Sequence, residues 1–387
     1  MTAQRNSNPA PEERLNLRLL GHSDMNGHGA TMQLIARGDH LYVGHFRGPV
    51  GISVLDVSEP RKPRVVKQIP APSGIRCLKL QVANDLLIVS NEQFGTTPAR
   101  TGMAIYELSN PTDPKPVGFF ETKGGGGPHW MWFIDGRYVY ASARLEGYTH
   151  RIALIVDVSD PSHPREVSRW WIPGMWTAGG EKPWWDPALN YNIHACCVHG
   201  DRLYMAMFDK GLGILDISDK EDPYLVSELQ WLNGRWAHTV LPLPARNLLV
   251  LSEETNELNC MEYPRYVRVI DIRDEQNPRI LSRFPTPRGN FRRRGLRFGC
   301  HDLHVNYPGS TVDDRLIYAT FYNAGVRVVD ISDPVAPKEV AYYVPEAPPG
   351  QKAIQTNQLF VDARGLIYLS DFEGAGVHIL EWNRQSL

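Results

Sequence analysis

The sequence predicts an all-β fold, a seven-bladed β-propeller whose blades are four-stranded antiparallel sheets. Three observations support this: a repeated two-strand unit, its regular spacing, and a chain that begins with the strand its last repeat lacks. The acidic residue of the unit recurs every 50 to 59 residues, which suits one four-stranded sheet per repeat. Its occurrences are Asp56, Glu107, Asp157, Asp216, Asp271, Asp330 and Glu381.

The clearest copy of the unit spans 151–171, RIALIVDVSDPSHPREVSRWW. Its first part, Ile152 to Val158, indicates a strand because β-branched and other apolar residues fill it. Asp-Pro and His-Pro mark a tight turn over 159–164, and a second strand follows over 165–171. No helical period competes with this pattern, so we expect very little helix.

Two further strands precede the unit in each repeat. In the fourth repeat they cover 193–198 and 203–208, joined by a short polar turn. Equivalent second strands begin near residues 40, 85, 137, 247, 315 and 365. Four strands in each of seven repeats give the expected propeller.

The two ends of the chain are complementary. The segment 15–21, LNLRLLG, matches the second strand of the unit, whereas the last repeat stops after its first strand at 376–382. We therefore expect the N-terminal strand to complete the last blade and close the ring, since closure removes open sheet edges that promote aggregation. Residues 1–14 are expected to form a surface arm, and 15–387 a single propeller domain.

The unit resembles the LVIVD repeat of bacterial β-propellers. The matching segments are SVLDVSEP (53–60), ALIVDVSDP (153–161), GILDISD (213–219) and VRVVDISDP (326–334). The resemblance implies the propeller fold for essentially the whole chain after the arm. It implies little about activity, because the motif lies on structural strands, where its acidic residue is expected to serve in packing and turns.

Composition places the chain among ordinary globular proteins, with 42% hydrophobic and 22% charged residues. A net charge of −2 argues against binding duplex nucleic acid, which needs a basic face. No apolar run is long enough for a membrane helix, and the N-terminus lacks a secretory pattern, so we expect no membrane partner. The five cysteines are odd in number and irregularly spaced, so we expect reduced thiols and a cytoplasmic location.

Four histidines fall at one level of the predicted channel. Aligning the repeats on their second strands places His129 and His194 nine residues before the anchor residue. His238 and His301 reach the equivalent position once loop insertions are allowed. Because neutral imidazole is a good ligand for transition metals, these four residues predict a site for a divalent metal, Fe, Mn or Zn. The alternative is that the rings hydrogen-bond channel water and nearby carbonyls.

Acidic residues are expected on the same face. Glu253 and Glu254 end an apolar strand in the blade that carries His238, and Asp302 directly follows His301. A carboxylate there would act as a general acid or base, or orient a histidine. The alternative for each is a solvated loop charge.

A long loop enters the first strand of the fourth blade. It runs from Trp170 to Asn192 and holds five tryptophans among glycines and prolines. Trp176 and Trp184 are its candidates for lining an apolar or aromatic substrate. The alternative is a small satellite core beneath the loop.

A second long loop, 285–300, enters the sixth blade and is rich in arginine. Guanidinium groups bind carboxylates bidentately, so we expect an anionic substrate. The candidates are Arg292, Arg294 and Arg297 in this loop, with Arg47 and Arg144 at the ends of second strands. The alternative is a solvated basic loop, or a subunit contact in a homo-oligomer.

These features favour a metal-dependent enzyme that acts on a small anionic, aromatic or apolar substrate at one mouth of the channel. Lyase or hydrolase chemistry is favoured, because the predicted pocket is rich in carboxylates. One alternative is a non-haem iron oxygenase, since carotenoid-cleaving oxygenases, which share the seven-bladed architecture, hold iron with four histidines. Another is a non-catalytic propeller that serves as a protein-interaction scaffold or a small-molecule binder.

Overall fold

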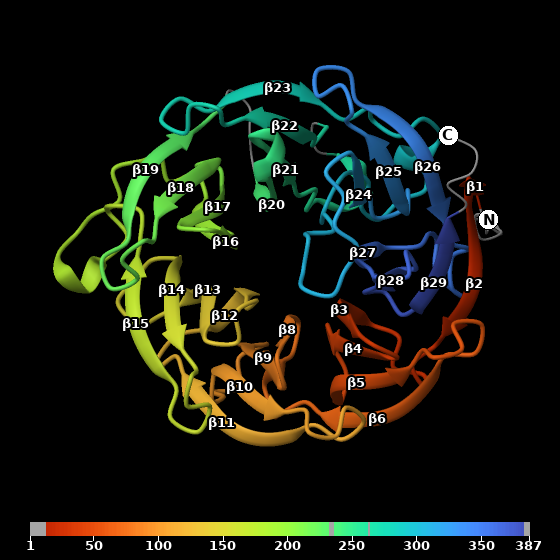
Figure 1. The fold of residues 1–387 in the computed structure, drawn as a ribbon, viewed down its shortest axis with the longest axis horizontal. Coiled ribbons are helices and arrows are strands. Elements are labelled where there is room, and N and C mark those ends of the chain that lie inside the picture. The colour runs from red at the N-terminus through yellow and green to blue at the C-terminus, as the bar shows by residue number, and fades with distance from the viewer. Residues whose placement is uncertain (1–12, 232–235, 262–263, 383–387) are drawn as a thin grey trace, which may run out of the picture.

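The computed structural model describes all residues except 1–12, 232–235, 262–263 and 383–387. Over these residues the chain is all-β, with antiparallel sheets arranged around a common centre (Figure 1). Helix is limited there to short 3₁₀ turns, none of which is long and apolar enough to cross a bilayer. The turns are η1 (Thr177–Gly179), η2 (Pro244–Arg246), η3 (Leu258–Cys260) and η4 (Phe291–Arg293). The expected all-β class is confirmed.

The strands of the N-terminal half form three groups, each running outward from the centre (Figure 1). The first group is β3 (Thr31–Arg37), β4 (His40–His45), β5 (Val50–Asp56) and β6 (Arg64–Pro70). The second group is β7 (Ile75–Arg76), β8 (Leu80–Ala83), β9 (Leu86–Gln93), β10 (Gly102–Glu107) and β11 (Lys115–Glu121). The third group is β12 (Gly127–Trp132), β13 (Tyr138–Arg144), β14 (Arg151–Asp157) and β15 (Arg165–Trp170).

An eight-stranded sheet follows, in which two four-stranded halves are joined by the single pair Phe208↔Ala237. One half is β16 (Tyr191–His199), β17 (Arg202–Phe208), β18 (Leu212–Asp216) and β19 (Tyr224–Leu229). The other half is β20 (Ala237–Leu243), β21 (Leu248–Glu253), β22 (Val267–Asp271) and β23 (Arg279–Arg283).

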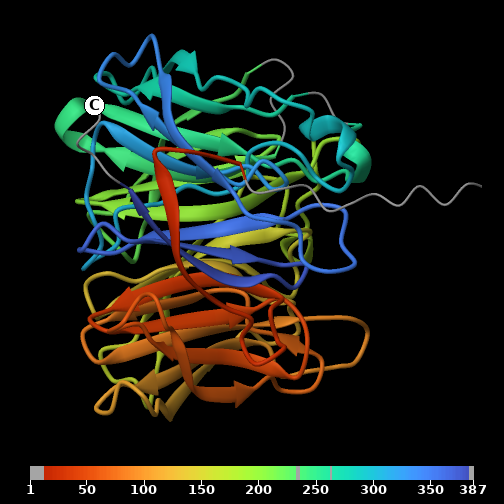
Figure 2. The same cartoon turned by 90° about the vertical axis from the view of Figure 1, so that its right-hand side faces the viewer.

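The last two groups each take one strand from the N-terminus. One is β24 (Leu316–Thr320), β25 (Val326–Asp330), β26 (Lys338–Val344) and β1 (Glu13–Leu15). The other is β27 (Thr356–Val361), β28 (Ile367–Asp371), β29 (Gly376–Trp382) and β2 (Leu17–Ser23). Figure 2 shows the red N-terminal strands lying beside the blue C-terminal ones.

The N-terminal strand is therefore split between two sheets. Asn16, between β1 and β2, has a φ of 57°, and its side chain donates to the carbonyl of Val340 at 2.8 Å. This left-handed residue lets the chain step from β26 to β29. Most of the predicted arm, residues 1–12, lies outside the described residues, while Glu13 and Arg14 belong to β1.

The repeated acidic residue serves in turns, as expected. Asp157 accepts hydrogen bonds from the Ser159 amide at 2.8 Å and from Arg165 at 3.0 Å. The same carboxylate-to-amide bond, two residues along the chain, forms at Asp56 and Asp216. It fixes the turn that joins the third strand of a blade to the fourth.

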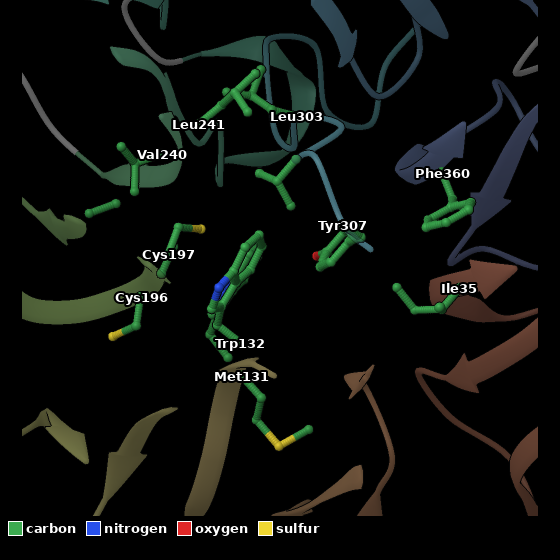
Figure 3. Packing of buried hydrophobic residues seen from close by; sticks show 14 of the residues in the cluster. Ile35, Met131, Trp132, Cys196, Cys197, Val240, Leu241, Leu303, Tyr307 and Phe360 are labelled. Atoms are coloured by element: carbon green, nitrogen blue, oxygen red, sulfur yellow. The ribbon is translucent and has the colours of Figure 1, made fainter. Parts of the chain in front are cut away.

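Apolar side chains fill the centre of the molecule below the histidine level. The inner strands run from the histidines toward Trp132, Cys197 and Leu241, each three residues further on, in the buried apolar cluster that Figure 3 shows around Trp132 and Tyr307. The rings of Trp132 and Tyr307 are 5.2 Å apart. These buried side chains therefore close the centre of the molecule below the histidines.

Candidate metal and substrate site

The four predicted histidines lie together. His129, His194 and His238 come from the inner strands β12, β16 and β20. His301 comes from an irregular segment, although its backbone still bonds to the carbonyl of Thr320 on β24 at 3.0 Å. Ring centroids are 4.8 Å apart from His129 to His194, 3.9 Å from His194 to His238, and 4.2 Å from His238 to His301.

Each of the four rings uses its Nδ1 atom to bond to the protein. His129 Nδ1 lies 2.9 Å from Glu92 Oε1, and His194 Nδ1 lies 2.8 Å from the carbonyl of His238. His301 Nδ1 lies 2.5 Å from the carbonyl of Asn357. Since carbonyls and carboxylates only accept, Nδ1 must carry the hydrogen in each case, and Nε2 keeps a lone pair.

His238 reaches the same state through a relay. Its Nδ1 is 2.7 Å from Thr239 Oγ1, and that hydroxyl donates to Asp302 Oδ1 at 2.5 Å. The hydroxyl hydrogen is therefore used on Asp302, which leaves Thr239 Oγ1 as the acceptor for the His238 N–H. Histidines that bind metals are usually held in this way, with the second nitrogen bonded to a carboxylate or carbonyl.

Burial keeps all four imidazoles neutral. It lowers the pKa of His129 to about 4, an effect that the Glu92 carboxylate only partly opposes. Burial also lowers the pKa of His194, His238 and His301 well below the ordinary value. At neutral pH each Nε2 is therefore available as a ligand or a proton acceptor.

Glu254 joins two of the histidines in a compact group. One ligand atom each from His238, Glu254 and His301 lies within 4.8 Å of the others, and His301 Nε2 is 4.0 Å from Glu254 Oε1. The Tyr322 hydroxyl donates to Glu254 Oε1 at 3.1 Å, and Arg297 Nη1 lies 3.5 Å away. Among the described residues, this is the group of three or more side chains whose spacing suits a metal ion, and His129 and His194 are not part of it.

A cavity of about 350 Å³ opens over the histidines. Its size is at the lower end of the range for ligand pockets, which indicates a small ligand. Its polar lining residues are Arg76, Lys79, His129, Arg151, Asn190, Asn192, His194, His238, Glu254, Asn256, Arg297, His301 and Tyr322. Its apolar lining residues are Met32, Phe46, Leu78, Phe208, Trp236 and Phe372.

Lys79 lines this cavity and is 1% exposed. Its Nζ atom lies 3.8 Å from Asp302 Oδ2 and 4.3 Å from the Trp130 ring centroid, and it has no hydrogen-bond partner within 3.5 Å in the described structure. Burial lowers the pKa of Lys79 and raises that of Asp302. Asp302 thus lies beneath the cavity and holds His238 and Lys79 in place.

Two arginines of the cavity have carboxylate partners. Arg76 Nε lies 3.2 Å from Glu92 Oε2, and Arg297 lies near Glu254 as described above. Arg297 is therefore the one residue of the predicted arginine loop that lines the cavity. The other candidates of that loop point elsewhere: Arg294 pairs with Glu13, and Arg292 Nη1 donates to the carbonyl of Cys260 at 3.0 Å.

The remaining sequence candidates lie outside the cavity. Glu253 is buried and accepts from Arg268 at 2.8 Å and from Trp231 Nε1 at 2.8 Å, which ties together β21, β22 and the chain after β19. Arg47 pairs with Glu373 at 2.8 Å near the rim, and Arg144 is exposed at the end of β13.

The tryptophan loop forms its own small cluster beside the mouth. Glu181 accepts from Trp171 Nε1 at 3.2 Å and from the amide of Trp176 at 3.0 Å. Trp184 is 64% exposed, and its ring stands against Trp185 at 5.8 Å. Neither Trp176 nor Trp184 lines the cavity; the loop contributes Asn190 and Asn192 instead.

The five cysteines are all buried and unpaired with one another. Burial raises the pKa of Cys77 to about 12 and raises that of Cys196, Cys197 and Cys300 further from neutrality. They are therefore protonated thiols at neutral pH, which disfavours a thiolate ligand or nucleophile.

His304, a weaker candidate ligand, is a buried histidine outside the cavity. Its Nδ1 accepts from the Val361 amide at 3.3 Å, its Nε2 lies 3.1 Å from the carbonyl of Thr311, and burial lowers its pKa to about 4. The unfolded chain takes up this proton near pH 6.5 and the native chain only near pH 4. Its contribution to stability is therefore present above pH 6.5 and lost as the pH falls toward 4, by up to about 1.4 kcal/mol per pH unit.

We expect His304→Gln, which keeps one donor and one acceptor, to make the free energy of unfolding less dependent on pH between 6.5 and 4. The number of protons taken up on unfolding should fall by about one. Urea unfolding at several pH values between 7 and 4 measures it. Equal slopes in the variant and the natural protein would contradict the assignment.

Several cavity residues carry no sequence motif. Lys79, Phe208 and Trp236 were not distinguished from the repeats that surround them. Arg151 had a usable signal: it begins the third strand of its blade, and third strands begin on the same face as second strands end. A basic residue at the start of a third strand could therefore have been assigned to the mouth of the channel from the sequence.

Comparison with known proteins supports the fold. The LVIVD repeat family model matches residues 28–69, 152–170, 195–230 and 316–344, which confirms the resemblance in the sequence. No curated protein matches the chain.

Solved structures that resemble it include the β-propeller domain of Cps50 (Swd1) from Myceliophteria thermophila. That structure has a TM-score of 0.58 and 13% identity, over 96% of this chain and 100% of that one. A protein from Lactobacillus plantarum has a TM-score of 0.56 and 13% identity, over 87% and 97%. The computationally designed Ika8 protein has a TM-score of 0.53 and 10% identity, over 94% and 98%. At these identities the likeness concerns the fold alone.

Proposed function

We propose that this LVIVD-repeat β-propeller is a metal-dependent enzyme that acts on a small anionic substrate in the cavity over the four histidines. The observation that carries the proposal is the common state of the histidines. In each one Nδ1 is bonded to the protein and the ring is neutral, so Nε2 retains its lone pair.

The proposed ligands are His238, His301 and Glu254. Two imidazoles and one carboxylate suit a divalent Fe, Mn or Zn ion, and one ligand atom from each lies within 4.8 Å of the others. His194, whose ring is 3.9 Å from that of His238, is the nearest further ligand. The Asp302–Thr239 relay and the carbonyl of Asn357 orient the two ligand rings.

The proposed chemistry is redox-neutral, a lyase or hydrolase reaction. The metal would polarise a carbonyl or activate water as a Lewis acid. Neutral His129 can accept a proton at Nε2, and the Glu92 carboxylate bonded to its Nδ1 would stabilise the resulting imidazolium. Tyr322 donates to Glu254 and accepts from Arg297, so these two residues would hold the proposed carboxylate ligand in position.

A non-haem iron oxygenase is the second candidate. The observation that favours it is the ligand set itself, because two histidines and one carboxylate are typical of non-haem Fe(II) oxygenases. Dioxygen uptake by the Fe(II)-loaded protein with a panel of aryl carboxylic acids separates the two reactions, since the redox-neutral reaction consumes none. The non-catalytic scaffold remains the third candidate, and it requires no metal.

Metal analysis of untagged protein tests the proposal directly. We expect about one equivalent of a transition metal per chain after purification, its removal by a chelator, and its return when Fe, Mn or Zn is added back. The absence of stoichiometric metal under all of these conditions would contradict the proposal.

We also propose that the blades number seven and form a closed ring. Counting the eight-stranded sheet as two blades gives seven groups among the described residues, six of four strands and one of five. The register of β2 against β29, from Leu17↔Trp382 to Ser23↔Val377, supports closure by the two ends of the chain.

A further inference from the structure

Arg151 differs from the other cations of the cavity. Arg76, Arg297 and Lys79 each have a carboxylate oxygen within 3.8 Å. Arg151 lines the same cavity but forms no ion pair within 4 Å among the described residues, and the carboxylates of Glu92 and Glu254 act on it only from farther away. The cavity therefore holds one guanidinium that no carboxylate of the described residues contacts directly.

Hydrogen bonds hold Arg151 through its backbone amide and its Nε atom. It is the first residue of β14, and both its amide and its Nε donate to Asn192 Oδ1, at 3.1 and 3.2 Å. Nε also donates to the carbonyl of Ile193 at 3.2 Å. The two terminal nitrogens, Nη1 and Nη2, form no hydrogen bond within the described structure. The guanidinium is thus fixed in position while its outer donors stay available.

The surroundings of Arg151 make this charge costly without a ligand. Burial lowers its pKa to about 10, which leaves it protonated at neutral pH but poorly solvated. An anion that supplied two acceptor oxygens would replace the lost hydration and form charge-assisted bonds in a weakly polar site.

An aromatic wall lies beside the guanidinium. The Arg151 Cζ atom is 5.2 Å from the Phe208 ring centroid, and Trp236 lies 4.5 Å from the same ring. Phe208 also stacks on His194 at 5.2 Å with an interplanar angle of 21°. A flat ligand attached to an anion on Arg151 would lie along this wall, next to the histidines.

We propose that Arg151 binds the carboxylate of a small aryl monocarboxylate through both terminal nitrogens, with the ligand's ring against Phe208 and Trp236. This inference rests on the proposed function, because it names the substrate class for the same cavity. One unpartnered cation matches a monoanion better than a phosphate dianion, and a planar fork matches a carboxylate. The small cavity volume favours one ring.

Calorimetric titration with three probes tests the inference: benzoate, its neutral isostere benzamide, and phenyl phosphate. We expect benzoate to bind about 10- to 100-fold more tightly than benzamide, the range for hydrogen bonds to a charged group. Phenyl phosphate should bind more weakly than benzoate. Arg151→Gln should remove the preference for benzoate over benzamide.

Two further variants keep the test decisive. Arg151→Lys retains the charge but not the fork, so it should bind benzoate with intermediate affinity even if Arg151→Gln fails to fold. Arg100→Gln removes an exposed arginine that pairs with Glu121 and does not line the cavity, and it should bind benzoate like the natural protein.

Metal content, measured on the same samples, separates this inference from the proposed function. Metal without benzoate binding, or benzoate affinity equal in Arg151→Gln and the natural protein, overturns the role of Arg151 alone. Benzoate binding that depends on Arg151 in a protein that never holds metal overturns the proposed metal enzyme and leaves the carboxylate site standing.

Discussion

Replacing His238 and His301 together by alanine is expected to abolish metal binding, from about one equivalent per chain to less than about a tenth. Both residues offer a neutral Nε2 beside Glu254, and the loss of two of three ligands leaves one carboxylate. Loss of even an outer residue that orients a ligand typically lowers metal affinity about 10- to 100-fold, so loss of two direct ligands exceeds that. Elemental analysis after equilibration with Zn or Fe measures the result.

His163→Ala provides the matched control. His163 lies in an exposed turn, 83% exposed at its side chain, and bonds only to neighbours in that turn. It should change neither metal content nor stability. If the His238 and His301 double variant keeps a full equivalent of metal, the ion is bound elsewhere and the proposed ligand set is wrong.

Asp302→Leu is expected to lower the free energy of unfolding by about 3–5 kcal/mol, the usual cost of leaving one member of a buried ion pair without its partner. Asp302 is 3% exposed and Lys79 is 1% exposed, and Lys79 Nζ has no other acceptor within hydrogen-bond distance in the described structure. The same substitution breaks the bond from Thr239 that orients His238. Urea or guanidinium denaturation, read from the midpoint at constant slope, gives the change.

The double variant Lys79→Met with Asp302→Leu should recover much of that stability, because both charges are then replaced by apolar groups of similar size. Lys79→Met alone should cost about as much as Asp302→Leu alone. Additive losses in the double variant would mean that the two side chains do not act as a pair. Metal content can fall in all Asp302 variants without affecting this comparison, which concerns stability alone.

The sequence predicted part of the candidate site and missed the rest for identifiable reasons. His129, His194, His238 and His301 were found because the repeat fixes the strand register, and equivalent positions of successive blades lie at one level of the centre. Among the carboxylates, the sequence could not rank Glu253 against Glu254. Adjacent residues in a strand point to opposite sides, and only the fold shows which one faces the cavity.

The loops were harder to interpret than the strands. Their composition suggested tryptophan and arginine contacts to the substrate. The structure instead places Trp176 and Trp184 in a cluster held by Glu181, and Arg297 is the one arginine of the 285–300 loop that lines the cavity. Loop side chains follow contacts made with distant segments, such as the pairing of Arg294 with Glu13, and no local pattern encodes these.

The sequence by itself determined the blade unit, its spacing and the complementarity of the two ends, because alternation of apolar residues and turn chemistry are local properties. Tertiary structure alone decided which charges are paired. Whether Arg76, Arg297 and Lys79 have carboxylate partners, and Arg151 has none, depends on residues far apart in the chain that meet at the centre. Charge pairing is a matter of distances of a few ångströms, and the folded structure sets those distances.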